Sequence, residues 1–183
     1  TVYALVKSLG KFEVMLSVDG GFSFEAAPGF PTGIIDDSGG LLATTPADPD
    51  MLLAVMLSSD YTPVLYKGNM TSDTWDLQAT GQTGDFEMNN GQGYFDLVLE
   101  IDPNYADLIF VGTTTFFKTV NGGDSFNVIG GYYGDFAIHP DVQDMKILPN
   151  GDMWISTDGG FSYSTDHFTN TNNFHARNNG LIG

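Results

Sequence analysis

Residues 17–24 read SVDGGFSF, and residues 156–166 read STDGGFSYSTD. Each stretch contains a hydroxyl residue, an Asp two positions later, a Gly two positions after the Asp and an aromatic residue three positions further on. Residues 119–126, TVNGGDSF, keep the same spacing with Asn in place of Asp. Whether these stretches are one structural element decides which acidic residues shape turns and which are available for chemistry.

Composition places the chain among globular β proteins. Its 183 residues are 42% apolar and 13% aromatic, which is enough for one buried core and favours a single domain. The 23 Gly residues and the short apolar runs, about four to eight residues long, favour strands and tight turns. No apolar run reaches about eighteen residues, so no membrane span is expected. The first residues, TVYALVKS, are typical of a strand and not of a signal peptide.

The net charge of −17 reflects a scarcity of cations, because only six residues are Lys or Arg. A surface of this charge excludes binding to a nucleic-acid backbone. It suits neutral glycans, cations or basic partners. The absence of Cys excludes disulfides and Cys-ligated metals. We expect no cofactor, although the sequence is compatible with a bound Ca²⁺.

Repeats are the strongest signal in the sequence. Three segments combine a Pro-containing turn with an apolar run: ADPDMLLAVML (47–57), DPNYADLIFVG (102–112) and LPNGDMWIS (148–156). Each follows one strand-like run and precedes two more, so the repeating unit has four strands, as in a propeller blade. The predicted blades of this single segment, residues 1–183, cover approximately 1–30, 31–80, 92–131 and 136–178.

Counting from a fixed point separates the similar stretches. Asn121 follows Asp107, the start of a second strand, by the same interval as Asp166 follows Asp152. Asp166 is therefore the counterpart of Asn121. The more obvious string, STDGG at 156–160, is predicted to be the turn between the second and third strands of its unit.

The same comparison gives one turn motif per unit. The predicted anchor residues recur at intervals of 45 to 52 residues: Asp19, Asn69, Asn121 and Asp166. The aromatic residues that accompany them are Phe24, Trp75, Phe126 and Phe174.

These motifs resemble those of the Asp-box, or BNR-repeat, β-propellers, a group that contains sialidases, sortilin-like receptors and the family 74 xyloglucanases. The resemblance covers nearly the whole chain and depends on two intact motifs, SVDGGFSF and TVNGGDSF. It implies an all-β arc of four-stranded antiparallel blades, in which the anchors are structural. The Asp or Asn side chain caps turn N–H groups, Gly adopts positive φ, and the aromatic ring packs between blades.

Strand counting predicts an incomplete ring. The chain begins with the second strand of a blade and ends after the fourth strand of another, which gives fifteen strands, or about three and three-quarter blades. Exposed strand edges are avoided in stable proteins. The expected partners are therefore the remaining blades of a larger propeller or a second copy of the chain.

Strand direction assigns the turns to two rims. In an up-and-down blade the turns after the first and third strands share one rim, which we call the lower rim. The turn after the second strand and the link between blades share the other, the upper rim. The anchors belong to the lower rim, whereas the upper rim is rich in Asp and Tyr. Its candidate carboxylates are Asp37, Asp85, Asp96, Asp135, Asp141, Asp144 and Asp158.

A binding site is predicted where His139, Asp141 and Asp158 converge near the channel mouth. His and Asp side chains at this place could bind a cation or hold a proton, and tyrosine rings could stack on a sugar. The full predicted set is Tyr132, Tyr133, His139, Asp141, Asp144 and Asp158. No catalytic residue or metal ligand is assigned.

Function is predicted at the level of a class. We expect a secreted or cell-surface module for recognition of, or scaffolding on, a glycan or protein, with no nucleic-acid partner and no membrane span. One alternative is part of a xyloglucanase-type glycoside hydrolase, since paired carboxylates act as acid and base in such enzymes. Another is a structural repeat of a surface or filament assembly. A self-sufficient sialidase is excluded, because the resemblance implies three carboxylate-binding arginines and Arg177 is the only one.

Overall fold

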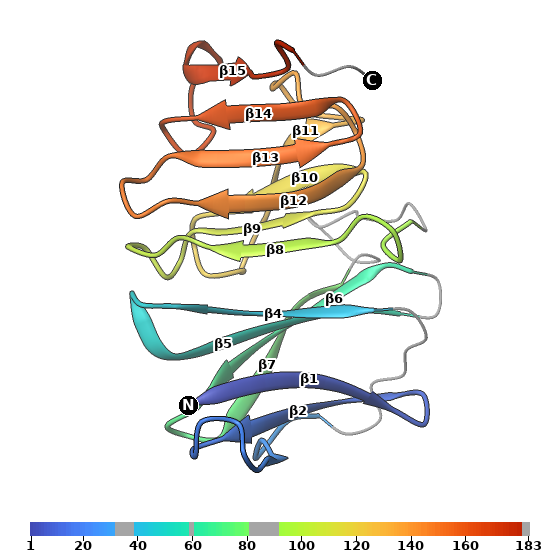
Figure 1. The fold of residues 1–183 in the computed structure, drawn as a ribbon, viewed down its shortest axis with the longest axis vertical. Coiled ribbons are helices and arrows are strands. Elements are labelled where there is room, and N and C mark those ends of the chain that lie inside the picture. The colour runs from blue at the N-terminus through green and yellow to red at the C-terminus, as the bar shows by residue number, and fades with distance from the viewer. Residues whose placement is uncertain (32–38, 59–60, 81–91, 181–183) are drawn as a thin grey trace.

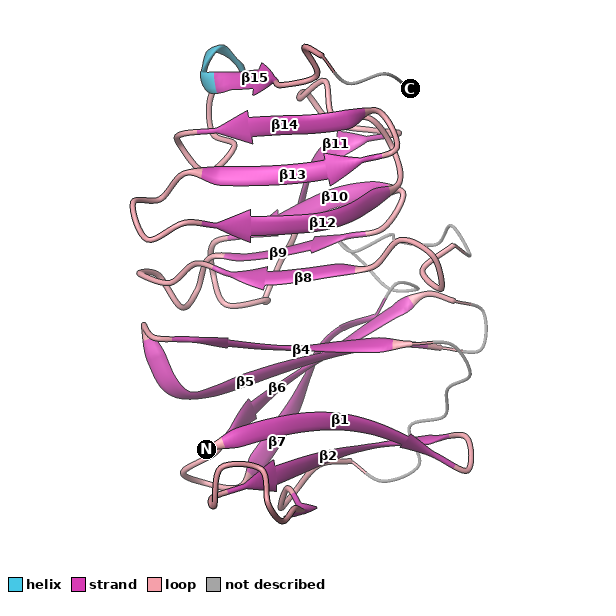
Figure 2. Ribbon diagram, in the orientation of Figure 1, coloured by secondary structure: helices cyan, strands magenta, loops and turns pink. Residues whose placement is uncertain are grey.

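The computed structural model describes residues 1–31, 39–58, 61–80 and 92–180. Within these ranges the chain forms fifteen strands in four antiparallel sheets and one 3₁₀ turn (Figures 1 and 2). Asp37 and Asp85, two of the candidate carboxylates, lie outside the described residues.

The sheets follow one another along the chain. The first contains β1 (Val2–Ser8), β2 (Lys11–Ser17) and β3 (Glu25–Ala26). The second contains β4 (Gly40–Thr45), β5 (Asp48–Leu57), β6 (Pro63–Asn69) and β7 (Thr74–Thr80). The third contains β8 (Val98–Ile101), β9 (Ile109–Gly112), β10 (Thr115–Thr119) and β11 (Asn127–Gly131). The fourth contains β12 (Val142–Ile147), β13 (Met153–Thr157), β14 (Gly160–Ser164) and β15 (Phe174–Ala176), with the 3₁₀ turn Thr171–Asn173 before β15.

Each sheet is a simple meander in which every strand pairs with its neighbours in the chain. The first strands of successive sheets contact one another, β4 with β8 and β8 with β12, and β1 contacts β4. The sheets are therefore propeller-type blades stacked around one side of an axis, and none of them closes on itself. The predicted all-β arc is confirmed. The first sheet has three strands, with β1 at its inner edge.

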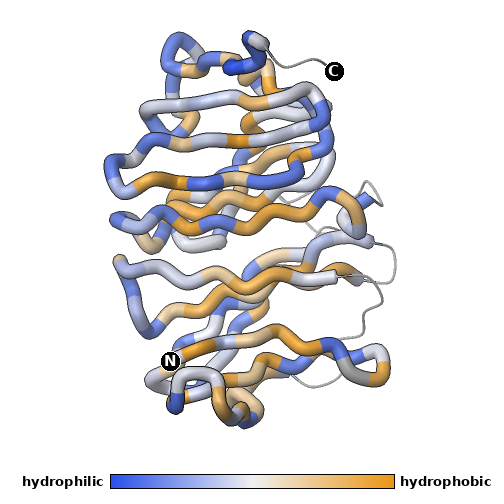
Figure 3. The backbone as a smooth tube through the Cα atoms, viewed as in Figure 1, coloured by the Kyte–Doolittle hydropathy of each residue, from blue (hydrophilic) through white to orange (hydrophobic). Residues whose placement is uncertain are grey.

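The core lies between the blades. β5 is buried on both faces: Leu52 packs toward the first sheet, whereas Leu53 and Val55 pack toward the third. A strand covered on both faces has no exposed alternation, which explains the continuous run MLLAVML. Phe110 and Met153 form the equivalent layer between the third and fourth sheets. In Figure 3 apolar residues follow the strands.

The two rims lie at opposite ends of the strands. In the view of Figure 1, the β2–β3 turn of the first blade and the turns after the first and third strands of the other three blades lie at the left, which is the lower rim, whereas the β1–β2 turn lies at the right. The β5–β6 and β13–β14 turns and the entries to β8 and β12 lie at the right, which is the upper rim. Residues on one rim thus come from links and turns far apart in the sequence.

All four anchor residues lie at the lower rim, where a blade turns toward its outermost strand. Their side-chain oxygens accept backbone N–H bonds: Asp19 from Phe22 and Ser23 (both 3.0 Å), Asn69 from Thr71 (3.0 Å) and Ser72 (2.9 Å), Asn121 from Ser125 (3.1 Å), and Asp166 from Thr169 (3.2 Å) and Asn170 (3.0 Å). In three of the motifs the hydroxyl two residues earlier accepts a further N–H bond, as in Ser17 from Gly21 (2.9 Å), whereas Lys67 stands at this position before Asn69. Hydrogen bonds from Ser23, and then from Ser17, hold the pKa of Asp19 well below its usual range.

The accompanying aromatic residues are buried to different degrees. Phe126 is buried between the second and third sheets, and Trp75 packs edge-on against Phe30 at 4.9 Å between ring centroids. Phe174 is partly buried between the third and fourth sheets. Phe24, which the resemblance also places between blades, is 43% exposed. It precedes β3, and this two-residue strand leaves the ring at the surface.

The fourth turn motif departs from the two intact motifs at its two central positions. His167 and Phe168 occupy the places of Gly122 and Gly123, and both keep the positive φ of those glycines, at 59° and 51°. Phe168 is buried in the core between the third and fourth sheets, where it contacts Phe116 at 5.4 Å between centroids. Phe174, the aromatic residue assigned to this motif, follows Asp166 at a longer interval than in the intact motifs. Phe168 adds a second buried ring from within the turn itself.

Candidate functional site

The string STDGG lies at the upper rim, as the β13–β14 turn. Thr157 and Gly160 pair at the base of this turn, and Asp158 lies at its tip. The Asp158 backbone N–H donates to the Asp141 carbonyl at 3.3 Å. The Gln143 side-chain amide donates to Asp158 Oδ1 at 3.0 Å. Asp141, on the link that enters β12, and Asp158, in the β13–β14 turn, are therefore neighbours.

His139 packs against the same turn. A Cβ built on Gly159 would overlap the His139 side chain, so only Gly permits this approach. The His139 ring is exposed, and its Nδ1 lies 2.9 Å from the Pro140 carbonyl oxygen. His139, Asp141 and Asp158 thus lie side by side on the upper rim.

Asp96 completes a cluster of three carboxyl groups at the entries to β8 and β12. Its side chain is fully buried, and neither of its oxygens has a hydrogen-bond partner among the described residues. Oδ1 of Asp141 is also buried and unpartnered there. Burial raises the pKa of Asp96 to about 7, with further contributions from the adjacent Asp141 carboxyl and from Asp158. The Asp96 and Asp141 carboxyls can hydrogen-bond each other only if one keeps its proton.

The backbone of Asp141 is held in an unusual conformation. Its φ of 67° lies in the left-handed region, which costs a residue other than Gly about 1–3 kcal/mol. The next residue, Val142, donates its N–H to the Thr113 carbonyl in the β9–β10 turn at 2.9 Å. The link between the third and fourth blades is therefore fixed at the point where Asp141 faces Asp96.

Exposed aromatic rings lie on the same rim. Tyr132 and Tyr133 are 61% and 72% exposed, in a loop bounded by Gly131 and Gly134. Both glycines have positive φ, and a side chain on either would collide with backbone atoms. The structure records no hydrogen bond or ring contact between these tyrosines and the carboxyl cluster in the described part of the chain. The predicted convergence is thus recorded for His139, Asp141 and Asp158 only.

Two further tyrosines belong to this rim. Tyr61, in the β5–β6 turn, packs edge-on against Tyr94 of the link into β8, at 5.1 Å between ring centroids. Gly93 makes this contact close, because a Cβ there would meet the Tyr61 carbonyl oxygen at 2.8 Å. Sequence reasoning missed this pair, since the residues lie in separate blades.

Among the described residues, no contact is recorded between the Asp144 side chain and the carboxyl cluster. Asp144 is on β12, where its carboxylate accepts the N–H of Met145 at 2.8 Å. A shallow pocket of about 190 Å³ on that face of the sheet is lined by Asp144, Lys146, Trp154 and Phe161, among others.

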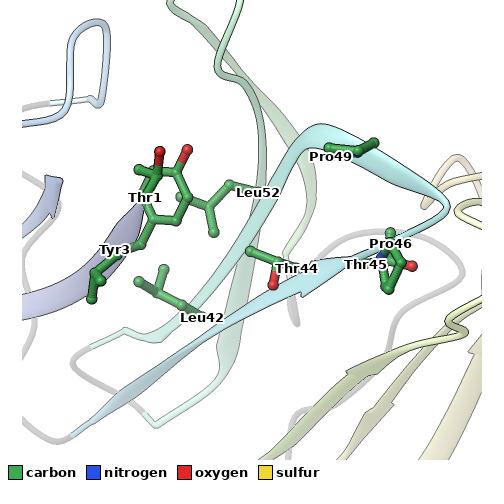
Figure 4. Close-up of a pocket in the computed structure, with 9 residues that line it drawn as sticks. Thr1, Tyr3, Leu42, Thr44, Thr45, Pro46, Pro49 and Leu52 are labelled. Carbon is green, nitrogen blue, oxygen red and sulfur yellow. The ribbon is translucent and has the colours of Figure 1, made fainter. Parts of the chain in front are cut away.

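A larger pocket, of about 700 Å³, lies between the first and second blades. Tyr3 of β1 faces Leu42 of β4 and Leu52 of β5 across it (Figure 4). Its lining contains no carboxylate, His or Lys. The pocket lies beside the edge of β1 where the other blades have an inner strand, so it belongs to the architecture of the arc.

A second buried acidic group lies at the lower rim. Asp102 accepts the N–H groups of Asn104 and Tyr105 at 2.8 and 3.1 Å, and its other oxygen lies 3.2 Å from His167 Nε2. Lys118 donates to the His167 carbonyl at 2.8 Å. These contacts join the third blade to the fourth and are structural.

The described residues contain no group of three or more His, Cys, Asp or Glu side chains arranged to hold a metal ion. They also contain no helix that is long and apolar enough to cross a membrane.

Comparison with known proteins gives similarity in shape alone. No family model matches the chain, and no curated protein matches it. Among solved structures it is similar to the GH74 enzyme of Niastella koreensis (TM-score 0.49, 16% identity, 74% of this chain and 22% of that chain). It is also similar to YCF48 bound to a D1 peptide (TM-score 0.46, 16% identity, 82% of this chain and 46% of that chain). A third similar structure is PorZ, a surface component of the type-IX secretion system of Porphyromonas gingivalis (TM-score 0.47, 15% identity, 90% of this chain and 23% of that chain). The chain spans less than half the length of each.

Proposed function

We propose that the chain is a recognition module of a secreted or cell-surface protein, and that its upper rim binds a glycan. The observation that carries this proposal is the set of exposed tyrosine rings on the same rim as the carboxyl cluster. Aromatic faces stack on sugar rings, and carboxylate oxygens accept hydrogen bonds from sugar hydroxyls. Tyr132 and Tyr133 supply the rings, and Asp158 is the most exposed carboxylate of the cluster.

The charge of the molecule favours an uncharged glycan. With a net charge of −17 the surface repels sulfated or carboxylated chains. Neutral polysaccharide is therefore the class of ligand that we assign to the upper rim. A protein ligand with a basic surface is the second candidate, because the same charge would attract it.

Binding is favoured over hydrolysis. A retaining or inverting glycosidase places two carboxyl groups against the sugar. In the cluster Asp96 is fully buried, so it does not reach a ligand on the rim. Asp141 and Asp158 remain, and they are held by contacts with each other and with Gln143.

The test compares the two rims. We expect an array of neutral oligosaccharides to identify a ligand, and titration calorimetry to show that Tyr132→Ala combined with Tyr133→Ala weakens its binding at least about tenfold, as expected when stacking rings are lost. Phe22→Ala is the matched control, because Phe22 is 94% exposed on the lower rim. Equal affinity of the wild type and the tyrosine variant would contradict the proposal, as would loss of binding in the Phe22 variant alone.

A further inference from the structure

The carboxyl group of Asp96 has no counter-charge in the described residues. It is fully buried, both of its oxygens lack partners, and it lies against the carboxyl group of Asp141, whose Oδ1 is also buried and unpartnered. No Lys or Arg in the described part of the chain forms an ion pair with either residue. A buried ionised carboxylate is costly unless it is paired or coordinates a metal.

The negative charge of the Asp96 and Asp141 carboxylates can be neutralised by a proton or by a cation. A shared proton removes one negative charge and leaves the other beside Asp158. A divalent cation removes both charges and occupies the oxygens that lack partners. Buried polar groups without partners in a folded protein are the usual sign of a bound ion or water.

We propose that Asp96 and Asp141 bind one divalent cation of the Ca²⁺ type between the third and fourth blades. Ca²⁺ takes six to eight oxygen ligands in flexible geometry, and these include carboxylates, carbonyl oxygens and water. The two carboxylates supply up to about four of these oxygens. The described residues offer no third side-chain ligand in place, so carbonyl groups and water complete the shell.

The position of the pair gives the ion a structural role. Asp96 lies on the link that enters β8, and Asp141 lies on the link that enters β12. An ion shared between them ties two blades together at the upper rim. It also offsets the strain of the left-handed backbone at Asp141, whose carboxyl lies beside that of Asp96. This inference does not depend on glycan binding.

The experiment measures thermal unfolding at pH 8 in excess Ca²⁺ and in a chelator. Binding to the folded state alone raises its stability, so we expect Ca²⁺ to raise the Tm of the wild type by about 5 °C or more. Asp96→Asn and Asp141→Asn remove the charge at nearly constant volume, and Asn tolerates positive φ, so both variants should fold and lose the Ca²⁺ response. Asp135→Asn, at an exposed Asp of the same rim, should keep it.

The pH dependence of the stability distinguishes a bound ion from a shared proton. In chelator, burial raises the folded-state pKa of Asp96 to about 7 from 3.8, so stability falls as the pH rises from about 4 to 7. In Ca²⁺ the trend should reverse, because protons compete with the ion. The groups that face Asp96 are Asp141 and Asp158. An unchanged wild-type Tm on addition of Ca²⁺ at pH 8, with the chelator trend at every Ca²⁺ concentration, would overturn the proposal in favour of the proton.

Discussion

At the scale of single residues, the turn anchors act through hydrogen bonds that do not depend on burial. Asn121 Oδ1 accepts the Ser125 N–H at 3.1 Å and the Thr119 hydroxyl at 2.7 Å, and its amide donates to Ser125 Oγ at 2.9 Å. One side chain therefore bonds groups on both sides of the turn. Its role resembles that of a helix N-cap.

We expect Asn121→Ala to lower the free energy of unfolding by about 1 kcal/mol, because the capped N–H loses its partner. Asn121→Asp keeps the acceptor oxygen and should cost less. Urea denaturation measures both. An Asn121→Ala protein that is as stable as the wild type but no longer binds ligand would show that the residue acts in recognition.

The acid sensitivity of the fold follows from the same turns. Hydrogen bonds from Ser23, and then from Ser17, lower the pKa of Asp19 from the ordinary value of 3.8. A lowered pKa gives stability that is present above pH 3.8 and is lost as the pH falls below it. Asp19→Asn should therefore flatten the loss of stability between about pH 5 and pH 2, measured by urea denaturation at each pH. Parallel curves for the two proteins would contradict this assignment.

At the scale of the element, the fourth turn motif has a buried aromatic side chain where an intact motif has glycine. Phe168 fills the space between the third and fourth sheets from a position with positive φ, and His167 reaches Asp102 of the neighbouring blade. Lys118 donates to both of their carbonyl groups, at 2.8 and 3.1 Å. The strain of two left-handed residues is offset by a buried ring and by contacts between blades.

Phe168→Ala should destabilise the protein by about 3–5 kcal/mol, since a fully buried ring is removed and leaves a cavity. Phe168→Gly relieves the backbone strain but leaves the same cavity, so it should also be strongly destabilising. Phe161→Ala is the control, because that ring is 46% exposed and its loss should cost under about 1 kcal/mol. Equal effects of Phe168→Ala and Phe161→Ala in thermal denaturation would contradict the packing.

Local patterns predicted the fold well because strands, turns and their order depend on neighbouring residues. The string at 156–160 was placed in the β13–β14 turn by counting alone, and the strand order is that of the structure. The pairing of Asp96 with Asp141 could not be predicted, because it depends on two links meeting across a blade and on burial that acidic residues rarely show. One signal was present: Asp96 and Asp141 each lie just before the first strand of successive blades. Nothing in the sequence indicated that His167 and Phe168 would adopt the positive φ of the glycines in the intact motifs.

At the scale of the whole molecule, the arc is open. The first blade has three strands, and the inner edge of β1 pairs with no strand of the described residues. The pocket of about 700 Å³ lies beside that edge.

The isolated chain should therefore self-associate, because an open strand edge offers backbone groups to another chain. Light scattering coupled to gel filtration should show dimers or larger species. A Lys or Pro placed on β1, for example Ala4→Pro, should reduce that association if it depends on this edge. A monodisperse wild-type monomer would contradict the account of the open edge.

Hydrogen–deuterium exchange with and without the selected oligosaccharide tests the central claim, that recognition belongs to the upper rim, most directly. We predict that the ligand slows exchange in the Tyr132–Gly134 loop, the link before β12 and the β13–β14 turn, while the anchor turns at 17–23 and 119–125 stay unchanged. Slowed exchange confined to those lower-rim turns, or no change on either rim with saturating oligosaccharide, would contradict it.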